Sequence, residues 1–272
     1  MSPRPLITAS RRHPVRRLGL ATRGNGHLTP GDVRHALDRG VNFLNWCGAP
    51  DALSRTVADL GPRRREVFVC VQFEARTAGE AEAELQNLLR ELNTESIDAL
   101  TFYYVEEPAE WRQIVGPGGA LEYCRRAKEK GLVRLLGLTS HQRPLAAEWA
   151  RSGLLDLLMI RYNAAHRGAE RDVFPVTDAT GLPVVVYTCL RWGALLRPTP
   201  DDPPGFAVPR APEWYRFALR SPSVAVALMA PADRAELDED LTALDAPPLT
   251  DEEYAQLAEH GRRVRRHTGG FP

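Results

Sequence analysis

LVRLLGL (Leu132 to Leu138), LLDLLMI (Leu154 to Ile160) and LPVVVY (Leu182 to Tyr187) are the three runs that decide the fold of this chain. Short runs that are nearly continuous in Leu, Val and Ile are typical of strands buried on both faces. The polar segments between them are long enough for one helix each. Strands that alternate with helices pair in parallel through right-handed crossovers, so the stretch predicts part of a parallel α/β sheet.

Each of these runs is followed by small, polar or aromatic residues. They are Thr139, Ser140, His141, Tyr162, Asn163, Tyr187 and Thr188. In parallel α/β proteins the loops at the carboxyl ends of the strands build the ligand site. The same stretch therefore predicts both a scaffold and one wall of a pocket.

The alternation of strand and helix extends over the whole chain. Further strands are predicted at residues 17–22, 41–45, 67–73, 97–104 and 223–228. Helices are predicted at residues 29–40, 51–60, 77–92, 121–130, 144–151, 170–179, 233–244 and 249–267, and the helix at 170–179 is interrupted by Pro175. Eight strand–helix pairs in 272 residues predict a single (β/α)8 TIM barrel domain spanning residues 1–272. The Pro-rich residues 197–212 are predicted to form a mobile loop over the barrel mouth.

Composition limits the classes of function. Lys plus Arg equals Asp plus Glu at 35 each, so no net field favours nucleic acid or a membrane. The arginine clusters at residues 11–17, 63–65 and 262–266 are interpreted as solvated surface. Four cysteines without a CxxC pair, and the lack of an apolar leader, predict a reduced, cytoplasmic protein. The histidines other than His141 show no ligand spacing, so no metal is expected.

Five motifs, in order, resemble the aldo-keto reductase superfamily. They are ALDRGVNFLN (Ala36 to Asn45), KGLVRLLGLTS (Lys130 to Ser140), DLLMIRYN (Asp156 to Asn163), VVVYTCLRWGALL (Val184 to Leu196) and, more loosely, the segment from Val226 to Leu244. The resemblance implies a (β/α)8 barrel that uses NADPH or NADH without a separate nucleotide-binding domain. It covers nearly the whole chain.

The catalytic residues of that family are not retained. The resemblance implies an Asp, a Tyr, a Lys and a His, because a carbonyl that receives hydride needs an acid whose pKa is lowered by a fixed cation. Here Asn45 stands at the Asp position, Gly48 to Pro50 at the Tyr position and Gln72 at the Lys position, and the His position falls on Tyr103 or Tyr104. The standard mechanism is therefore not expected.

The cofactor positions implied by the resemblance are partly retained. Ser140 matches the serine that binds the nicotinamide carboxamide, Tyr187 the ring that stacks on the nicotinamide, and Thr188 a small hydroxyl residue. His141 replaces an Asn and Met159 a Gln. Arg234 is the remaining basic residue near the phosphate-binding segment. NADP(H) is therefore a possible cofactor whose binding is expected to be weakened or absent.

Several residues keep two interpretations. Asn45 and Gln72 are either a neutral ligand-binding pair or relics that hydrogen-bond to each other. Tyr103 and Tyr104 either include a relocated general acid or are packing residues. Strand alternation is expected to turn one of them away from the interior, and that one is expected to pack in the core. His141 is either functional or structural. Glu106 and Glu107 either hold a cationic ligand or are exposed loop acids. Trp46, Trp192 and Trp214 are expected at the mouth, where they would line an apolar site.

Two hypotheses for function follow. The first is a catalytically inactive or strongly divergent barrel that binds a small molecule in its mouth, with a partly retained nicotinamide pocket. The second is an active NADP-dependent oxidoreductase that acts on a carbonyl or alcohol, with Tyr103 or Tyr104 and His141 transferring protons. The loss of all four catalytic positions favours the first hypothesis. The sequence identifies no protein partner.

Overall fold

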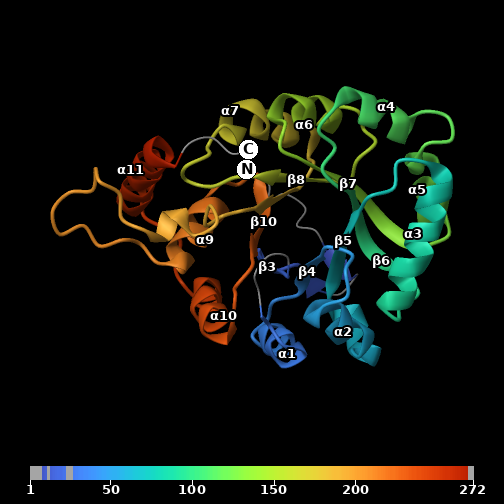
Figure 1. Cartoon of the computed structure of the whole chain (residues 1–272), viewed down its shortest axis with the longest axis horizontal. Helices are drawn as coiled ribbons and strands as arrows, with labels where there is room; N and C mark the ends of the chain where they lie inside the picture. Colours follow the sequence, from blue (N-terminus) through green and yellow to red (C-terminus); the bar gives the residue numbers. More distant parts are fainter. Residues whose placement is uncertain (1–7, 11–12, 23–26, 269–272) are drawn as a thin grey trace.

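The computed structural model of the chain describes residues 8–10, 13–22 and 27–268. Eight parallel strands close into a barrel in the order β10-β3-β4-β5-β6-β7-β8-β9, and helices surround it (Figure 1). The predicted (β/α)8 barrel is confirmed. Arg11 and Arg12 of the first predicted arginine cluster lie outside the described residues.

The barrel strands are β3 (Leu18–Ala21), β4 (Phe43–Trp46), β5 (Phe68–Phe73), β6 (Ile97–Phe102), β7 (Val133–Ser140), β8 (Leu157–Arg161), β9 (Val184–Tyr187) and β10 (Val224–Met229). The α-helices are α1 (Pro30–Asp38), α2 (Ala52–Ala58), α3 (Ala78–Glu91), α4 (Pro108–Val115), α5 (Ala120–Glu129), α6 (Arg143–Ala150), α7 (Ala169–Asp172), α8 (Phe174–Thr180), α9 (Ala211–Arg220), α10 (Arg234–Leu241) and α11 (Asp251–His267). Short 3-10 turns are η1 (Gly61–Glu66), η2 (Ala194–Leu196) and η3 (Thr242–Leu244), and a small hairpin of β1 (Thr8–Ser10) and β2 (His13–Pro14) precedes the barrel.

Two helices depart from the predicted pattern. The helix α4 begins with Pro108 in its first turn and buries Trp111 and Ile114. The helix α9 starts at Ala211, inside the predicted loop, and buries an aromatic stripe that includes Trp214 and Phe217. Both helices are short and have prolines at or just before their first turn. Each buries only a few apolar residues, too few to show the helical period of 3.6 residues clearly in the sequence. The predicted helix at 170–179 is indeed interrupted, but at Val173: α7 ends at Asp172, α8 begins at Phe174, and Pro175 lies in the first turn of α8.

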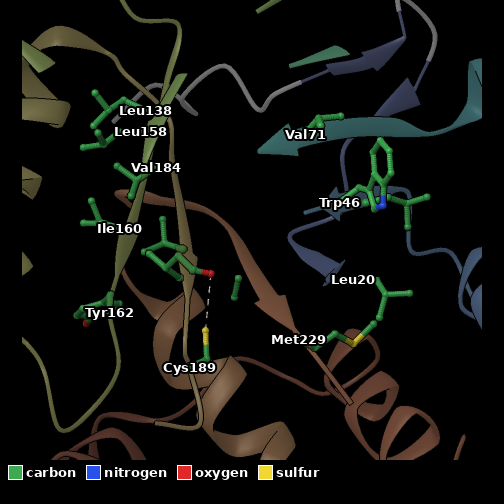
Figure 2. Close-up of a cluster of buried hydrophobic side chains, with 14 of the residues drawn as sticks. Leu20, Trp46, Val71, Leu138, Leu158, Ile160, Tyr162, Val184, Cys189 and Met229 are labelled. Carbon is green, nitrogen blue, oxygen red and sulfur yellow. Dashed lines mark hydrogen bonds between the residues drawn. The ribbon is translucent and has the colours of Figure 1, made fainter. Parts of the chain in front are cut away.

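Side chains alternate between two apolar layers. The smaller layer fills the barrel interior, where the rings of Phe43 and Phe68 stack with centroids 5.0 Å apart. The larger layer lies between the strands and the helices, and Figure 2 shows part of it, with Leu138, Leu158 and Ile160 from β7 and β8. The two-residue period of a strand produces this division. It also determines which residues at the strand ends face the interior.

Asp98, near the start of β6, joins the amino-terminal ends of several strands. Its carboxylate accepts hydrogen bonds from Arg64 of η1 at 2.9 Å, Arg134 of β7 at 2.8 Å and the backbone N–H of Val69 in β5 at 2.9 Å. A buried carboxylate is stable when its oxygens are paired in this way. Charged hydrogen bonds therefore hold the amino-terminal ends of these strands together.

Candidate functional site at the barrel mouth

On six neighbouring strands, the last side chain on the face toward the barrel interior is polar or aromatic. These side chains are Asn45 (β4), Gln72 (β5), Tyr103 (after β6), His141 (after β7), Arg161 (β8) and Tyr187 (β9). The residues two positions earlier, such as Phe43, Cys70 and Met159, belong to the interior apolar layer. Residues two apart share a face of a strand, so these six side chains form the rim of the mouth.

The β4–β5 side of this rim carries acceptors without partners. Asn45 is 2% exposed, and neither its Oδ1 nor Oε1 of Gln72 has a hydrogen-bond partner among the described residues. The interpretation that Asn45 and Gln72 satisfy each other is therefore wrong for these two oxygens. Oγ1 of Thr139, on β7, also has no hydrogen-bond partner among the described residues. Each unpaired buried acceptor costs free energy, which a hydrogen-bond donor would recover.

Tyr103 and Tyr104 stack on each other with ring centroids 3.9 Å apart. The expectation that strand alternation turns one of them away is wrong, because β6 ends at Phe102 and Tyr104 has a left-handed backbone with φ of 41°. That conformation is rare and strained for a bulky residue, and it brings the Tyr104 ring to 4.4 Å from the His141 ring. Both tyrosines therefore belong to the mouth.

Glu106 binds His141 through two hydrogen bonds. Its Oε1 accepts from the backbone N–H of His141 at 2.8 Å and lies 3.1 Å from the ring Nδ1. Burial alone would raise the pKa of Glu106, but the hydrogen bonds from His141 outweigh it, and the pKa of the carboxyl is lowered. The interpretation of Glu106 as an exposed loop acid is therefore wrong. Glu107 instead caps α4.

Tyr187 closes the rim on the other side of His141, with the two rings edge-to-face at 5.8 Å. Its hydroxyl donates to the carbonyl of Ser140 at 3.4 Å. Burial raises the pKa of Tyr187 well above its ordinary value, although nearby Arg161 opposes the shift. The phenol therefore stays protonated. The Ser140 hydroxyl, which is buried, accepts from the backbone N–H of Gln142 at 3.1 Å.

The structure brings together four of the six predicted cofactor residues. Ser140, His141, Tyr187 and Thr188 lie at the ends of β7 and β9, the two strands that flank β8. Met159 lies deeper, 1% exposed in the interior layer, with its sulfur 4.0 Å from that of Cys70.

Arg234 lies apart from this group, between α10 and α1. Its Nε donates to Asp32 Oδ1 at 2.6 Å. Two backbone N–H groups around the start of α10 are also engaged, because Asp233 accepts from the N–H of Glu236, and Glu236 accepts from that of Ala232. A helix start whose amides are already bonded offers fewer donors to a phosphate.

Sequence reasoning missed a basic group at the β8 end of the mouth. Burial lowers the pKa of Arg161. Burial also lowers the pKa of His166 to about 3, together with the charges of Arg191 and Arg161, so this imidazole is neutral near neutral pH. Arg191 donates to the hydroxyl of Thr268 at 2.8 Å. Arg161 was recognisable in the sequence, because it lies two residues after Met159 and so shares its face.

The three tryptophans expected at the mouth differ in their surroundings. Trp46 is fully buried and its indole N–H donates to the carbonyl of Ala49 at 2.8 Å, while Trp214 is 1% exposed in the core. Trp192 is 68% exposed. Trp46 nonetheless lines a cleft of about 630 Å³, together with Gln72 and the small residues from Gly48 to Pro50. The cleft occupies the position at which the family resemblance implies a tyrosine.

The loop at residues 197–210 is fastened to α11. Asp202 accepts from Nε of Arg263 at 2.6 Å and lies 3.1 Å from Nδ1 of His260. Arg263 is thus buried, in contrast to the predicted surface position, whereas Arg266 pairs with Asp201 at the surface. Whether the loop moves stays a prediction.

Two classes of feature are absent from the described residues. No three His, Cys, Asp or Glu side chains within residues 8–10, 13–22 and 27–268 converge as a metal site would require. In the same part of the chain, no helix combines the length and apolarity needed to cross a bilayer.

Comparisons with known proteins agree with this architecture. The model of the Aldo/keto reductase family matches residues 29–211. An aldo-keto reductase from Bacillus halodurans in its holo form superposes with a TM-score of 0.76 at 18% identity, over 93% of this chain and 94% of that one. An aldo-keto reductase from Klebsiella pneumoniae in complex with NADPH gives 0.76 at 19% identity, over 96% of each chain. At these identities the structural likeness shows the fold. No curated protein matches the sequence.

Proposed function

The chain belongs to the aldo/keto reductase family, and we propose that it is a divergent member that binds a small molecule in the barrel mouth and lacks the standard carbonyl reductase mechanism. The observation that carries this proposal is the pair of unpartnered oxygens, Asn45 Oδ1 and Gln72 Oε1, at the positions where the family resemblance implies Asp and Lys. Two neutral amides supply no cation to a neighbouring phenol. A tyrosine without such a cation keeps a pKa near ~10 or higher and is a weak acid.

The same oxygens indicate what the ligand offers. Amide oxygens accept hydrogen bonds and do not attract anions, so a ligand group that reaches them carries N–H or O–H donors. The cleft beside Gln72 and the rim of tyrosines give such a ligand polar and aromatic walls. We do not assign nucleic acid or a membrane as a partner, because the chain has no net charge.

A nicotinamide cofactor fits one side of the mouth better than the other. Ser140, Tyr187 and Thr188 lie together, and the Klebsiella pneumoniae protein is described in complex with NADPH. At the phosphate end, Arg234 is engaged with Asp32, and Asp233 caps the N–H of Glu236 in the first turn of α10. The proposal is therefore weak NADP(H) binding through the nicotinamide half. Buried thiols at Cys70, Cys124 and Cys189 support a reducing, cytoplasmic location.

The second candidate is an active NADP-dependent oxidoreductase that acts on a carbonyl or an alcohol with a non-standard proton donor. One observation favours it. Tyr104 and His141 are in ring contact, and Glu106 orients His141. A histidine held by a carboxylate can transfer a proton without the family's Lys and Asp.

A calorimetric titration with NADPH and NADH tests the proposed pocket. We expect weak binding that is lost in Tyr187→Ala and retained in Tyr123→Ala, a control on the outer helix α5. An absence of heat at millimolar cofactor would sink the nicotinamide pocket. Oxidation of NADPH with a panel of carbonyl compounds, abolished by Tyr103→Phe or His141→Asn, would instead overturn the inactive reading in favour of the second candidate.

A further inference from the structure

The geometry points to a proton-accepting couple at the mouth, in which Glu106 fixes the tautomer of His141 and Nε2 of His141 accepts a hydrogen bond or a proton from an N–H or O–H group of the ligand. This inference rests on the proposed function, because it takes the barrel mouth as the ligand site. It assigns Glu106 as a positioning residue and His141 as the residue that contacts the ligand. Neither role belongs to the four catalytic positions implied by the family resemblance.

Glu106 is held in place before it meets the imidazole. The preceding residue, Val105, donates its backbone N–H to the carbonyl of Thr139 in β7 at 3.0 Å. The backbone N–H of Glu106 donates to the carboxylate of Glu110 in α4 at 2.8 Å. These contacts fix the loop after β6 against both neighbours. The carboxylate therefore reaches His141 from a preorganised backbone.

The two hydrogen bonds to one oxygen decide the state of the ring. Because the pKa of Glu106 is lowered, its carboxylate is ionised near neutral pH and can only accept. A ring nitrogen 3.1 Å away must then carry a hydrogen, so the contact selects the tautomer with hydrogen on Nδ1 whenever the imidazole carries a single hydrogen. Nε2 is left with a lone pair. The side chain of His141 is 27% exposed, so this lone pair is not sealed in the core.

The surroundings of the ring place it where a ligand would lie. Tyr104 contacts it on one side, and Tyr187, which belongs to the rim, meets it edge-on. The left-handed backbone of Tyr104 is what brings the first ring into contact. Strain of this kind persists where the surrounding structure requires it, often at functional sites. A ligand that packs on Tyr187 lies beside the imidazole.

A second histidine in the chain shows what a purely structural pair looks like. His260 also meets a carboxylate, with Nδ1 3.1 Å from Asp202. Its ring, however, is fully buried between Phe206 and Trp214, and its Nε2 has no partner among the described residues. His260 therefore shares the carboxylate contact of His141 but lacks access to a ligand. It is an internal control.

The experiment is long-range ¹H–¹⁵N NMR of the full chain labelled with ¹⁵N-histidine, with His141→Asn used for assignment. We expect Nδ1 protonated and Nε2 unprotonated in the wild type. The tautomers should mix or invert in Glu106→Gln, whose amide can donate as well as accept, and the wild-type pattern should survive in Glu106→Asp. Glu107→Gln, on the adjacent residue, should change nothing.

Accessibility of the same atom is tested with diethyl pyrocarbonate, which acylates unprotonated imidazole nitrogens. Peptide mass mapping should show His141 modified several-fold faster than His260. A wild-type Nε2 that carries the hydrogen, a tautomer that ignores Glu106→Gln, or a His141 as unreactive as His260 would each overturn the inference. None of these measurements uses a nicotinamide cofactor. Their outcome is therefore independent of whether the proposed cofactor pocket binds NADPH or NADH.

Discussion

Tyr215 donates its hydroxyl hydrogen bond to Oδ2 of Asp240 at 3.1 Å, across the buried contact between α9 and α10. Both side chains are almost fully enclosed, and no salt bridge involving Asp240 is found among the described residues. Burial raises the pKa of Asp240 to about 7, and the hydrogen bond from Tyr215 opposes this only in part. The carboxyl therefore holds its proton in the folded state at pH values at which an exposed aspartate has lost it.

The stability of the protein should depend on this group. The pKa of Asp240 is about 7 when folded and about 3.9 when unfolded. Its contribution is complete below the unfolded pKa and is lost as pH rises through the folded pKa. We expect Asp240→Asn to exceed the wild type in free energy of unfolding at mildly alkaline pH, by on the order of 4 kcal/mol. The difference should shrink in acid. Urea unfolding across pH measures it, and Asp245→Asn, at an exposed aspartate nearby, should leave the pH profile unchanged.

Two buried threonines in the barrel interior should respond oppositely to loss of the hydroxyl. Thr101 donates to the carbonyl of Val71 at 3.1 Å, whereas Oγ1 of Thr139 has no partner among the described residues. We expect Thr101→Val to lower the free energy of unfolding by about 1 kcal/mol, and Thr139→Val to leave it unchanged or raise it by up to about 1 kcal/mol. Chemical denaturation of both variants decides the matter. Equal losses would show that the Thr139 hydroxyl is satisfied.

The loop at residues 197–210 should be released by one substitution. Burial of Asp202 opposes ionisation, but hydrogen bonds from Thr199, Arg263 and His260 hold its pKa at about 2. The neutral amide of Asp202→Asn loses the ion pair with Arg263. Limited proteolysis with peptide mapping should then show faster cleavage within the loop. Asp201→Asn, which removes more exposed contacts with Arg266 and His267, should have a smaller effect. Equal rapid cleavage of the wild type would mean that the loop is mobile despite these contacts.

Gly137 should not tolerate a side chain. A Cβ at this position in β7 would lie 2.6 Å from Cγ of Leu157 and 2.9 Å from Cγ2 of Thr101. We expect Gly137→Ala to lower the free energy of unfolding by about 1–3 kcal/mol through overpacking. Gly79, in the first turn of α3, has open space around it, so Gly79→Ala should be neutral or stabilising by up to about 1 kcal/mol. Thermal and chemical unfolding of the pair provide the comparison.

The barrel was predictable because its signal is repeated. The run from Val184 to Tyr187 is apolar on both faces, and the same pattern returns in each strand, so an error in one element does not change the architecture. The helix α9 lacks this redundancy. Its stripe of Trp214 and Phe217 follows prolines and covers only a few turns, so in the sequence this segment resembles the end of a loop.

The site was predictable only where it depends on strand period or on resemblance. Ser140 and Tyr187 were placed by motif, and Arg161 follows from alternation once Met159 is on the interior face. The contact of Glu106 with His141 is different, because it joins residues 35 positions apart. The neighbouring ring contact of Tyr104 with His141 in turn depends on the left-handed backbone of Tyr104. No local pattern of apolar residues encodes a positive φ at a tyrosine, so this contact becomes visible only in three dimensions.

The bonds of Asp98 to Arg64, Arg134 and the backbone of Val69 have a consequence for how this protein could change. They hold β5, β6 and β7 in register at the amino-terminal end of the barrel, which is opposite the mouth. Residues at the opposite end can then be exchanged without loss of strand alignment. In such a barrel the side chains at the mouth can diverge while the amino-terminal ends of β5, β6 and β7 stay aligned. The same property makes this barrel a suitable starting point for the directed evolution of new binding sites.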